Sequence, residues 1–154
     1  MTTDSKRLYV YTIGHGKRKR EAFLELLKEH GIDILVDVRR WPRSRIGYFS
    51  KESLEKWLPE ANVRYVWLGD ELGGYRRGGY EEYMHSRAFL EGIAHILRLA
   101  EDGRVCLMCL EISPNYCHRR FISHHLNRLG VNIVHILSKG RYEVIRANPK
   151  EDRG

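Results

Sequence analysis

The chain has 154 residues, of which 42% are apolar, and this length and composition are those of one globular domain with a buried core. It contains no run of about 18 apolar residues, which excludes a recognisable transmembrane helix, and residues 1–7 lack the apolar core of a signal peptide. Three cysteines are too few for a disulfide-rich scaffold. We therefore expect a cytoplasmic protein without membrane contacts.

The chain is basic, with 27 lysines and arginines against 20 aspartates and glutamates and a net charge of +7. This excess favours an anionic partner, either a small anionic or nucleotide-like ligand or a nucleic acid. The alternative is adaptation to a thermophile's growth temperature, because 31% of the residues are charged and the thermolabile amide glutamine is absent. Both explanations of the charge stay open at this point.

The first half of the chain alternates predicted strands with predicted helices. Residues 8–13 and 32–38 are rich in β-forming apolar residues and predict two strands. Between them, an apolar stripe at helical spacing begins at Phe23 and predicts a helix. Residues 63–68 predict a third strand, which follows a short helix that ends at Pro59.

The second half continues this order. A loop rich in Gly and Arg is predicted at residues 69–80, and an amphipathic helix at 89–100. The unbroken apolar run at 105–110 is typical of an interior strand that is covered on both faces. Residues 131–137 predict a fifth strand, and 142–145 offer a further edge strand.

The alternation of strands and helices predicts an α/β fold with right-handed crossovers. We expect a single doubly wound three-layer domain with a mostly parallel central sheet of about five strands. The domain should span residues 1–154, with its core at about 8–137 and a polar C-terminal tail at about 147–154.

Polar side chains follow each predicted strand. In a parallel sheet the carboxyl ends of the strands meet at one edge, where α/β folds bind their ligands. The residues expected at this edge are His15 after the first strand, Arg39, Arg40 and Ser44 after the second, Gly73, Gly74 and Arg76 after the third, and Cys109, Glu111, Cys117, His118 and Arg119 after the fourth. The sequence therefore predicts a cysteine, histidine and arginine site at the carboxyl edge.

Two of the three cysteines are candidates for chemistry. Cys109 ends an apolar strand near a helix N-terminus, a position that lowers the pKa of a thiol and favours a nucleophile or redox thiol. Cys117 is interpreted as a resolving thiol for Cys109, a metal ligand or a packed helix-cap residue. The loop between them contains Pro114 and can fold back, so we expect the two sulfurs to approach bonding reach. Cys106 lies in mid-strand and is more typical of the core.

The remaining candidates divide into acid/base and binding groups. Glu111, His118 and His15 are the acid/base candidates beside Cys109. A substrate would be bound by the residues Arg39, Arg40, Ser44, Gly73, Gly74, Cys117 and Arg119. Arg119 at a helix start opposes the helix dipole unless it meets an anion or a carboxylate. The alternative is a zinc site of cysteines and histidines. The spacing of these residues lacks the pairs of closely spaced ligands that structural zinc modules have, so we predict no metal and assign no cofactor.

Four motifs in order carry a family resemblance. They are Thr12-Ile13-Gly14-His15, then Leu35-Val36-Asp37-Val38-Arg39 with Pro42 and Ser44, then Leu72-Gly73-Gly74, and finally Leu107-Met108-Cys109 with Glu111 and Cys117-His118-Arg119. Together they resemble the uncharacterised family known as domain of unknown function 488, over about residues 8–137. The resemblance implies a compact α/β domain and no established reaction. Gly16 stands where that family usually has serine, so a role for that hydroxyl does not carry over.

Two functions are compatible with these residues. The first is an enzyme that acts on a small anionic or nucleotide-like substrate at the carboxyl edge of the sheet. The second is a basic nucleic-acid-binding module without catalysis, in which Trp41, Tyr48 and Tyr75 provide stacking surfaces. Arginines that converge on a pocket would favour the enzyme, whereas an open basic stripe would favour the module. The sequence does not determine the oligomeric state.

Overall fold

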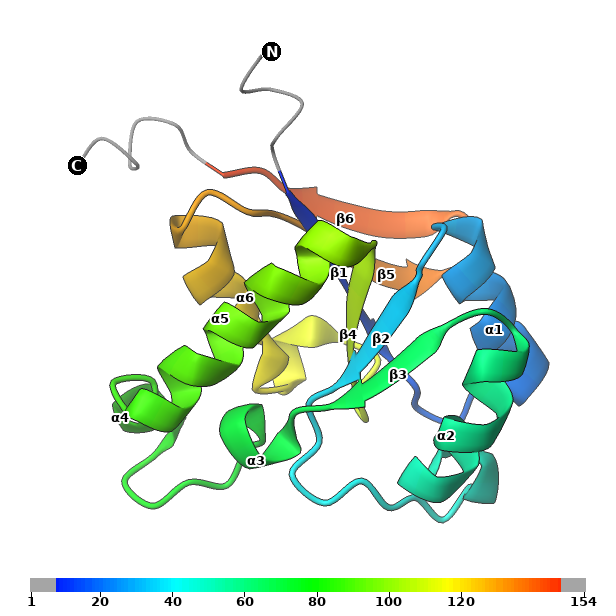
Figure 1. The fold of residues 1–154 in the computed structure, drawn as a ribbon, viewed down its shortest axis with the longest axis horizontal. Helices are drawn as coiled ribbons and strands as arrows, with labels where there is room; N and C mark the ends of the chain where they lie inside the picture. Colours follow the sequence, from blue (N-terminus) through cyan, green and yellow to red (C-terminus); the bar gives the residue numbers. More distant parts are fainter. Residues whose placement is uncertain (1–7, 148–154) are drawn as a thin grey trace.

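A computed structural model describes residues 8–147 and confirms the α/β fold with a mostly parallel sheet (Figure 1). The predicted polar tail lies outside the described residues from position 148 onward. The strands are β1 (Tyr9–Gly14), β2 (Ile34–Asp37), β3 (Arg64–Trp67), β4 (Val105–Cys109), β5 (Asn132–Ser138) and β6 (Arg141–Ile145). The α-helices are α1 (Arg20–Glu29), α2 (Lys51–Glu60), α3 (Gly69–Leu72), α4 (Tyr80–Tyr83), α5 (Arg87–Asp102) and α6 (Arg119–Arg128). Short 3-10 helices lie at Gly47–Phe49 and Pro114–Tyr116.

The six strands form one sheet in the order β3-β2-β4-β1-β5-β6. All neighbouring pairs are parallel except β5 and β6, which are antiparallel. β6 is the edge strand that was predicted at residues 142–145. β4 lies between β1 and β2, and all five of its residues are buried, as its apolar run predicts. In this register Cys109 of β4 lies opposite Gly14 of β1.

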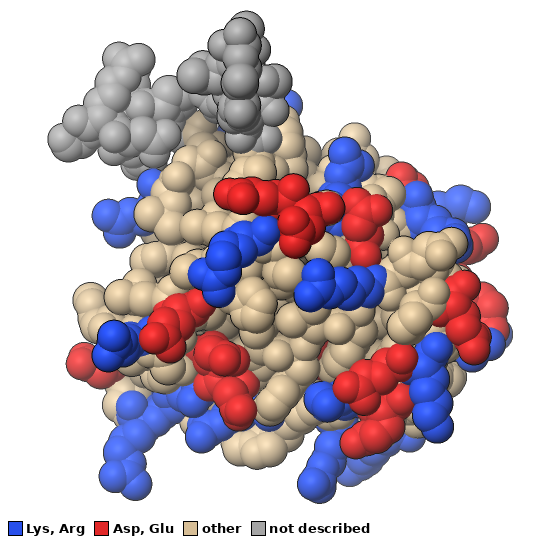
Figure 2. Space-filling view, in the orientation of Figure 1, with Lys and Arg blue, Asp and Glu red and all other residues tan. Residues whose placement is uncertain are grey.

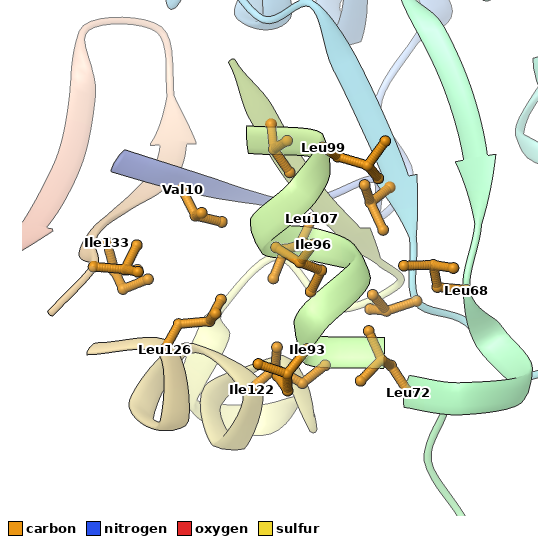
Figure 3. Close-up of a cluster of buried hydrophobic side chains, with 14 of the residues drawn as sticks. Val10, Leu68, Leu72, Ile93, Ile96, Leu99, Leu107, Ile122, Leu126 and Ile133 are labelled. Carbon is orange, nitrogen blue, oxygen red and sulfur yellow. The ribbon is translucent and has the colours of Figure 1, made fainter. Parts of the chain in front are cut away.

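Helices cover both faces of the sheet (Figure 1). Against one face, α5 and α6 bury Ile93, Ile96 and Leu126 beside Val10 and Leu107 of the strands (Figure 3). Against the other face, α1 and α2 bury a second cluster of apolar side chains, which includes Phe23, Leu27, Leu54, Leu58 and Leu35. The two clusters make the three layers of the predicted fold. Within residues 8–147, no helix has the length and apolar character needed to cross a bilayer.

Residues 69–80 differ from the predicted loop, because α3 forms one helical turn at its start. Leu72 at the end of α3 is fully buried and packs in the core cluster beneath α5. Gly92 of α5 makes room for it, since a Cβ atom at Gly92 would lie 2.8 Å from the Leu72 side chain. This helix therefore depends on a tertiary contact, which local sequence propensity does not contain.

Candidate functional site

A cavity of about 660 Å³ opens at the carboxyl edge of the sheet. This volume lies within the usual range of small-molecule sites. The loops that follow β1, β2, α3 and β4 supply its walls. Several predicted site residues lie together on these walls: His15, Arg39, Arg40, Ser44, Gly74, Glu111, Cys117 and His118. Cys109, Gly73 and Arg119 lie behind the lining instead, where Cys109 and Arg119 are buried.

Most of the charged groups in the cavity wall are cations. Besides Arg39, the wall contains Lys17, Arg40, Arg43 and Arg45, which face one acidic group, Glu111. Within residues 8–147, only Arg39 of these five cations forms a salt bridge. The other four charges are therefore left to attract an anion. The predicted site did not include Lys17, Arg43 or Arg45, although four arginines within residues 39–45 indicate an anion-binding loop.

A buried ion pair forms the base of this loop. The Asp37 carboxylate is fully buried and accepts hydrogen bonds from Arg39 Nε at 2.8 Å, from Arg39 Nη2 at 2.7 Å and from the Arg39 backbone N–H at 3.0 Å. The Tyr65 hydroxyl donates a fourth bond to Asp37 at 2.6 Å. Burial, together with the Asp37 charge, raises the pKa of Tyr65, so this hydroxyl stays a donor. Asp37 thus neutralises Arg39 and fixes its guanidinium at the cavity wall.

His15 is held in its neutral form against Arg39. Its Nδ1 lies 3.0 Å from the Gly16 carbonyl oxygen. Because a carbonyl oxygen can only accept a hydrogen bond, Nδ1 carries the hydrogen and Nε2 carries the lone pair. That atom lies 3.3 Å from Arg39 Nη1, and the ring stacks on Phe49 with 4.7 Å between ring centroids. Burial and the Arg39 charge lower the pKa of His15 to about 4. At neutral pH His15 therefore serves as a hydrogen-bond acceptor that orients Arg39.

His15 and His135 make folding stability depend on pH. Burial lowers the pKa of both to about 4, below the unfolded value of 6.5. The unfolded chain then binds protons more tightly than the folded chain. The contribution of the two neutral histidines to the free energy of unfolding is therefore fully present above about pH 6.5 and is lost as the pH falls toward 4. We expect the free energy of unfolding to fall by about 1–2 kcal/mol per histidine between pH 7 and pH 5. Urea unfolding at the two pH values measures this fall.

Two histidine variants provide the control for this pH dependence. His15→Gln should reduce the difference between pH 7 and pH 5, whereas replacement of the exposed His85 by Gln should leave it unchanged. Equal stability of the wild-type protein at both pH values would show that these buried imidazoles do not control acid unfolding.

The Cys117 sulfur and the His118 imidazole lie side by side on the cavity wall. His118 Nε2 lies 2.9 Å from the Val38 carbonyl and must donate to it, which leaves the lone pair on Nδ1. Nδ1 lies 3.8 Å from Cys117 Sγ. Burial, followed by the contribution of the Arg119 charge, lowers the pKa of His118. When Cys117 is in its reduced form, a neutral His118 can therefore accept the thiol proton.

The sulfurs of Cys109 and Cys117 meet, as predicted from the intervening loop, and the two residues form a disulfide. Their Cα atoms are 7.4 Å apart, slightly beyond the expected range of about 4.4–6.8 Å. Cys109, the predicted nucleophile, is only 1% exposed, whereas Cys117 lines the cavity. Cys106 is fully buried, and burial raises the pKa of its thiol, which agrees with a core position.

Arg119, a predicted anion ligand, is fully buried under the loop that follows β4. Its Nη2 donates to the backbone carbonyls of Glu111 at 2.8 Å and Ile112 at 2.7 Å, and its Nη1 donates to Thr12 Oγ1 at 3.2 Å. Thr12 Oγ1 in turn lies 2.6 Å from His135 Nδ1. Arg119 therefore positions the cavity loop against the sheet. Burial lowers its pKa to about 10, so it stays charged at neutral pH.

The family assignment covers most of this architecture. A family model described as "Domain of unknown function DUF488" matches residues 19–126. The chain belongs to this family. The match includes the Asp37 and Arg39 loop and the Cys109, Cys117 and His118 segment, whereas β1 and His15 precede it. No curated protein and no solved structure shows significant similarity to the chain.

Metal binding has no preformed site in the described part of the chain. Residues 8–147 contain no cluster of three or more His, Cys, Asp or Glu side chains arranged to hold an ion.

Proposed function

We propose that this DUF488 protein is an enzyme that acts on a small anionic substrate through the thiol of Cys117. The observation that carries the proposal is that the Cys117 and His118 pair opens on the same cavity as Lys17, Arg43 and Arg45. The cations would bind the substrate's anionic group and hold its reacting atom near the sulfur. Such positioning converts a slow bimolecular attack into a fast step within one complex.

In the proposed mechanism, the reduced form of Cys117 is the reactive one. His118 Nδ1 accepts the thiol proton, and the resulting thiolate forms a bond to the electrophilic atom of the substrate while the bond from that atom to its leaving group breaks. The leaving group departs with the electron pair of the broken bond, and protonated His118 can return the proton to it. The Arg119 backbone N–H, 3.5 Å from Cys117 Sγ, adds a donor that favours the thiolate. The disulfide with Cys109 removes this nucleophile, so activity would require a reductant that restores both thiols. Relative to the sequence-based hypothesis, the two cysteines exchange roles.

The distribution of charge supports an enzyme over the alternative, a nucleic-acid-binding module. On the face shown in Figure 2, acidic and basic side chains are interspersed, and Lys and Arg side chains project along the lower edge. Four cations that form no salt bridge, Lys17, Arg40, Arg43 and Arg45, lie on the wall of one cavity, which suits a small ligand. A nucleic-acid-binding module would instead need an extended basic track along the backbone of its ligand.

Thiol alkylation tests the proposal. The quantity to measure is the rate of Cys117 alkylation by anionic iodoacetate divided by its rate with neutral iodoacetamide. In the reduced, folded protein this ratio should be higher than in the same chain unfolded in urea. We expect this ratio of rates to rise at least about tenfold on folding, because a charge-assisted contact contributes about 1.5–3 kcal/mol and about 1.4 kcal/mol is a factor of ten. Mass spectrometry identifies the alkylated residue and gives both rates.

Three variants separate the components of this reaction. Cys117→Ser should abolish the fast phase, and Arg43→Gln should reduce the preference for iodoacetate. The matched control is Arg98→Gln, which removes an exposed arginine of α5 that lies outside the cavity lining. An unchanged ratio of rates on folding would contradict an anion site beside this thiol.

A further inference from the structure

We infer that the anionic substrate is a mononucleotide, whose base stacks on Tyr75 and Trp41 at the rim of the cavity. This inference rests on the proposed function and names the substrate class of the same site. Both aromatic residues line the cavity, yet Tyr75 is 83% exposed and Trp41 is 59% exposed. Their ring centroids are 5.6 Å apart and their planes are inclined by 40°, so together they form one bent aromatic surface. Solvent-exposed aromatic surfaces of this kind stack nucleobases.

The backbone at Tyr75 supports a functional role for its ring. Tyr75 has a φ angle of +60°, a left-handed conformation that costs a residue with a side chain free energy and that glycine adopts easily. The preceding residues, Gly73 and Gly74, do not have positive φ angles. A turn that needed only this geometry would be best served by glycine at position 75. Because the exposed ring gains little from packing, its placement at the rim points to a ligand.

Arg40 contacts both residues of the aromatic surface. Its Nη1 donates to the Tyr75 carbonyl at 2.6 Å, and its guanidinium lies 5.2 Å from the centre of the Trp41 ring. The loop after β2 and the loop after α3 are thereby tied together at the rim. Lys17, Arg43 and Arg45 lie on the same cavity wall and would receive the phosphate.

The same loop connects the stacking surface to the proposed nucleophile. Gly74 packs on the His118 ring so closely that a Cβ atom there would lie 3.2 Å from Nδ1. Tyr75 is the next residue, and adjacent Cα atoms are about 3.8 Å apart. A nucleotide whose base stacks on Tyr75 would therefore lie beside the loop that contacts His118. The cavity of about 660 Å³ suits a ligand of that size.

Binding of three compounds to the reduced protein tests this inference: adenosine 5′-monophosphate, ribose 5-phosphate and adenosine. Isothermal titration calorimetry should give an affinity for the monophosphate about tenfold higher than for ribose 5-phosphate, as expected for one base stacked on an aromatic ring. Adenosine, which lacks the phosphate, should bind more weakly than the monophosphate. Lengthening the ligand to a 5′-phosphorylated oligodeoxyadenylate should change the affinity only a few-fold.

Variants locate the base. Tyr75→Gly, which tolerates the positive φ angle, and Trp41→Ala should each reduce the preference for the monophosphate over ribose 5-phosphate. The matched control is Tyr142→Ala, which removes an exposed tyrosine of the edge strand β6. Equal affinities for the monophosphate and ribose 5-phosphate would overturn the inference, and so would an affinity that rises steeply with oligonucleotide length. Rapid alkylation by iodoacetate in the same preparation would show that the anion site survives even if the nucleotide assignment fails.

Discussion

Asp37→Asn should lower the free energy of unfolding by about 3–5 kcal/mol, because it leaves a buried guanidinium without its counter-charge. Arg39 is only 7% exposed and directs both Nε and Nη2 at the Asp37 carboxylate. The asparagine amide preserves the size of the side chain but provides one acceptor oxygen in place of two. Tyr65 loses a charged acceptor in the same step. Urea unfolding, with the slope against denaturant checked for constancy, measures the loss.

A surface ion pair provides the matched control for Asp37. Lys51 and Glu55 form an exposed i,i+4 pair on α2 at 3.1 Å, and Glu55→Gln should cost less than about 1 kcal/mol. The double variant Asp37→Leu with Arg39→Met should be less destabilised than Asp37→Asn, because no buried charge remains. A loss for Asp37→Asn as small as that for Glu55→Gln would mean that water reaches Arg39 and solvates it.

Gly14→Ala should also be severely destabilising, by about 3 kcal/mol or more, since the added methyl group has no space. Its Cβ would overlap the Glu111 carbonyl and lie 2.7 Å from Ile112 Cα, both of which are backbone atoms. That loop cannot yield easily. Arg119 holds the carbonyls of Glu111 and Ile112, and the backbone N–H of His15 donates to the Cys109 carbonyl at 2.9 Å. Thermal and urea unfolding should both report the change.

Gly47→Ala is the control, because a Cβ atom at Gly47 would meet nothing within 4 Å. We expect its stability to stay within about 0.5 kcal/mol of the wild-type value. If Gly14→Ala retained wild-type stability, the loop after β4 would have to move freely, and the fixed position of the cavity wall would be in question. Arg119→Met would loosen the same loop. In the double variant Gly14→Ala with Arg119→Met, the overlap of the added methyl group with this loop should therefore be partly relieved.

The sequence by itself determined the sheet and the edge at which the candidate site lies. The run Val105–Cys109 contains only apolar residues, which is the composition of a strand covered on both faces, and it is interior. Parallel strands bring their carboxyl ends to one edge, so strand assignments alone placed His15, Arg39 and His118 together. These predictions rest on hydrophobic pattern and chain direction, both of which are local properties.

Only the tertiary structure decided which of these side chains face the cavity. Cys109 and Arg119 were placed at the correct edge, but whether a side chain points inward depends on register and helix rotation, which residue spacing leaves unspecified. The contact of Tyr65 with Asp37 joins two strands that are 28 residues apart along the chain. The left-handed backbone of Tyr75 and the burial of Leu72 under α5 depend likewise on distant segments. The local sequence determines where a strand lies and in which direction it runs, whereas contacts between strands and helices form only when the chain has packed.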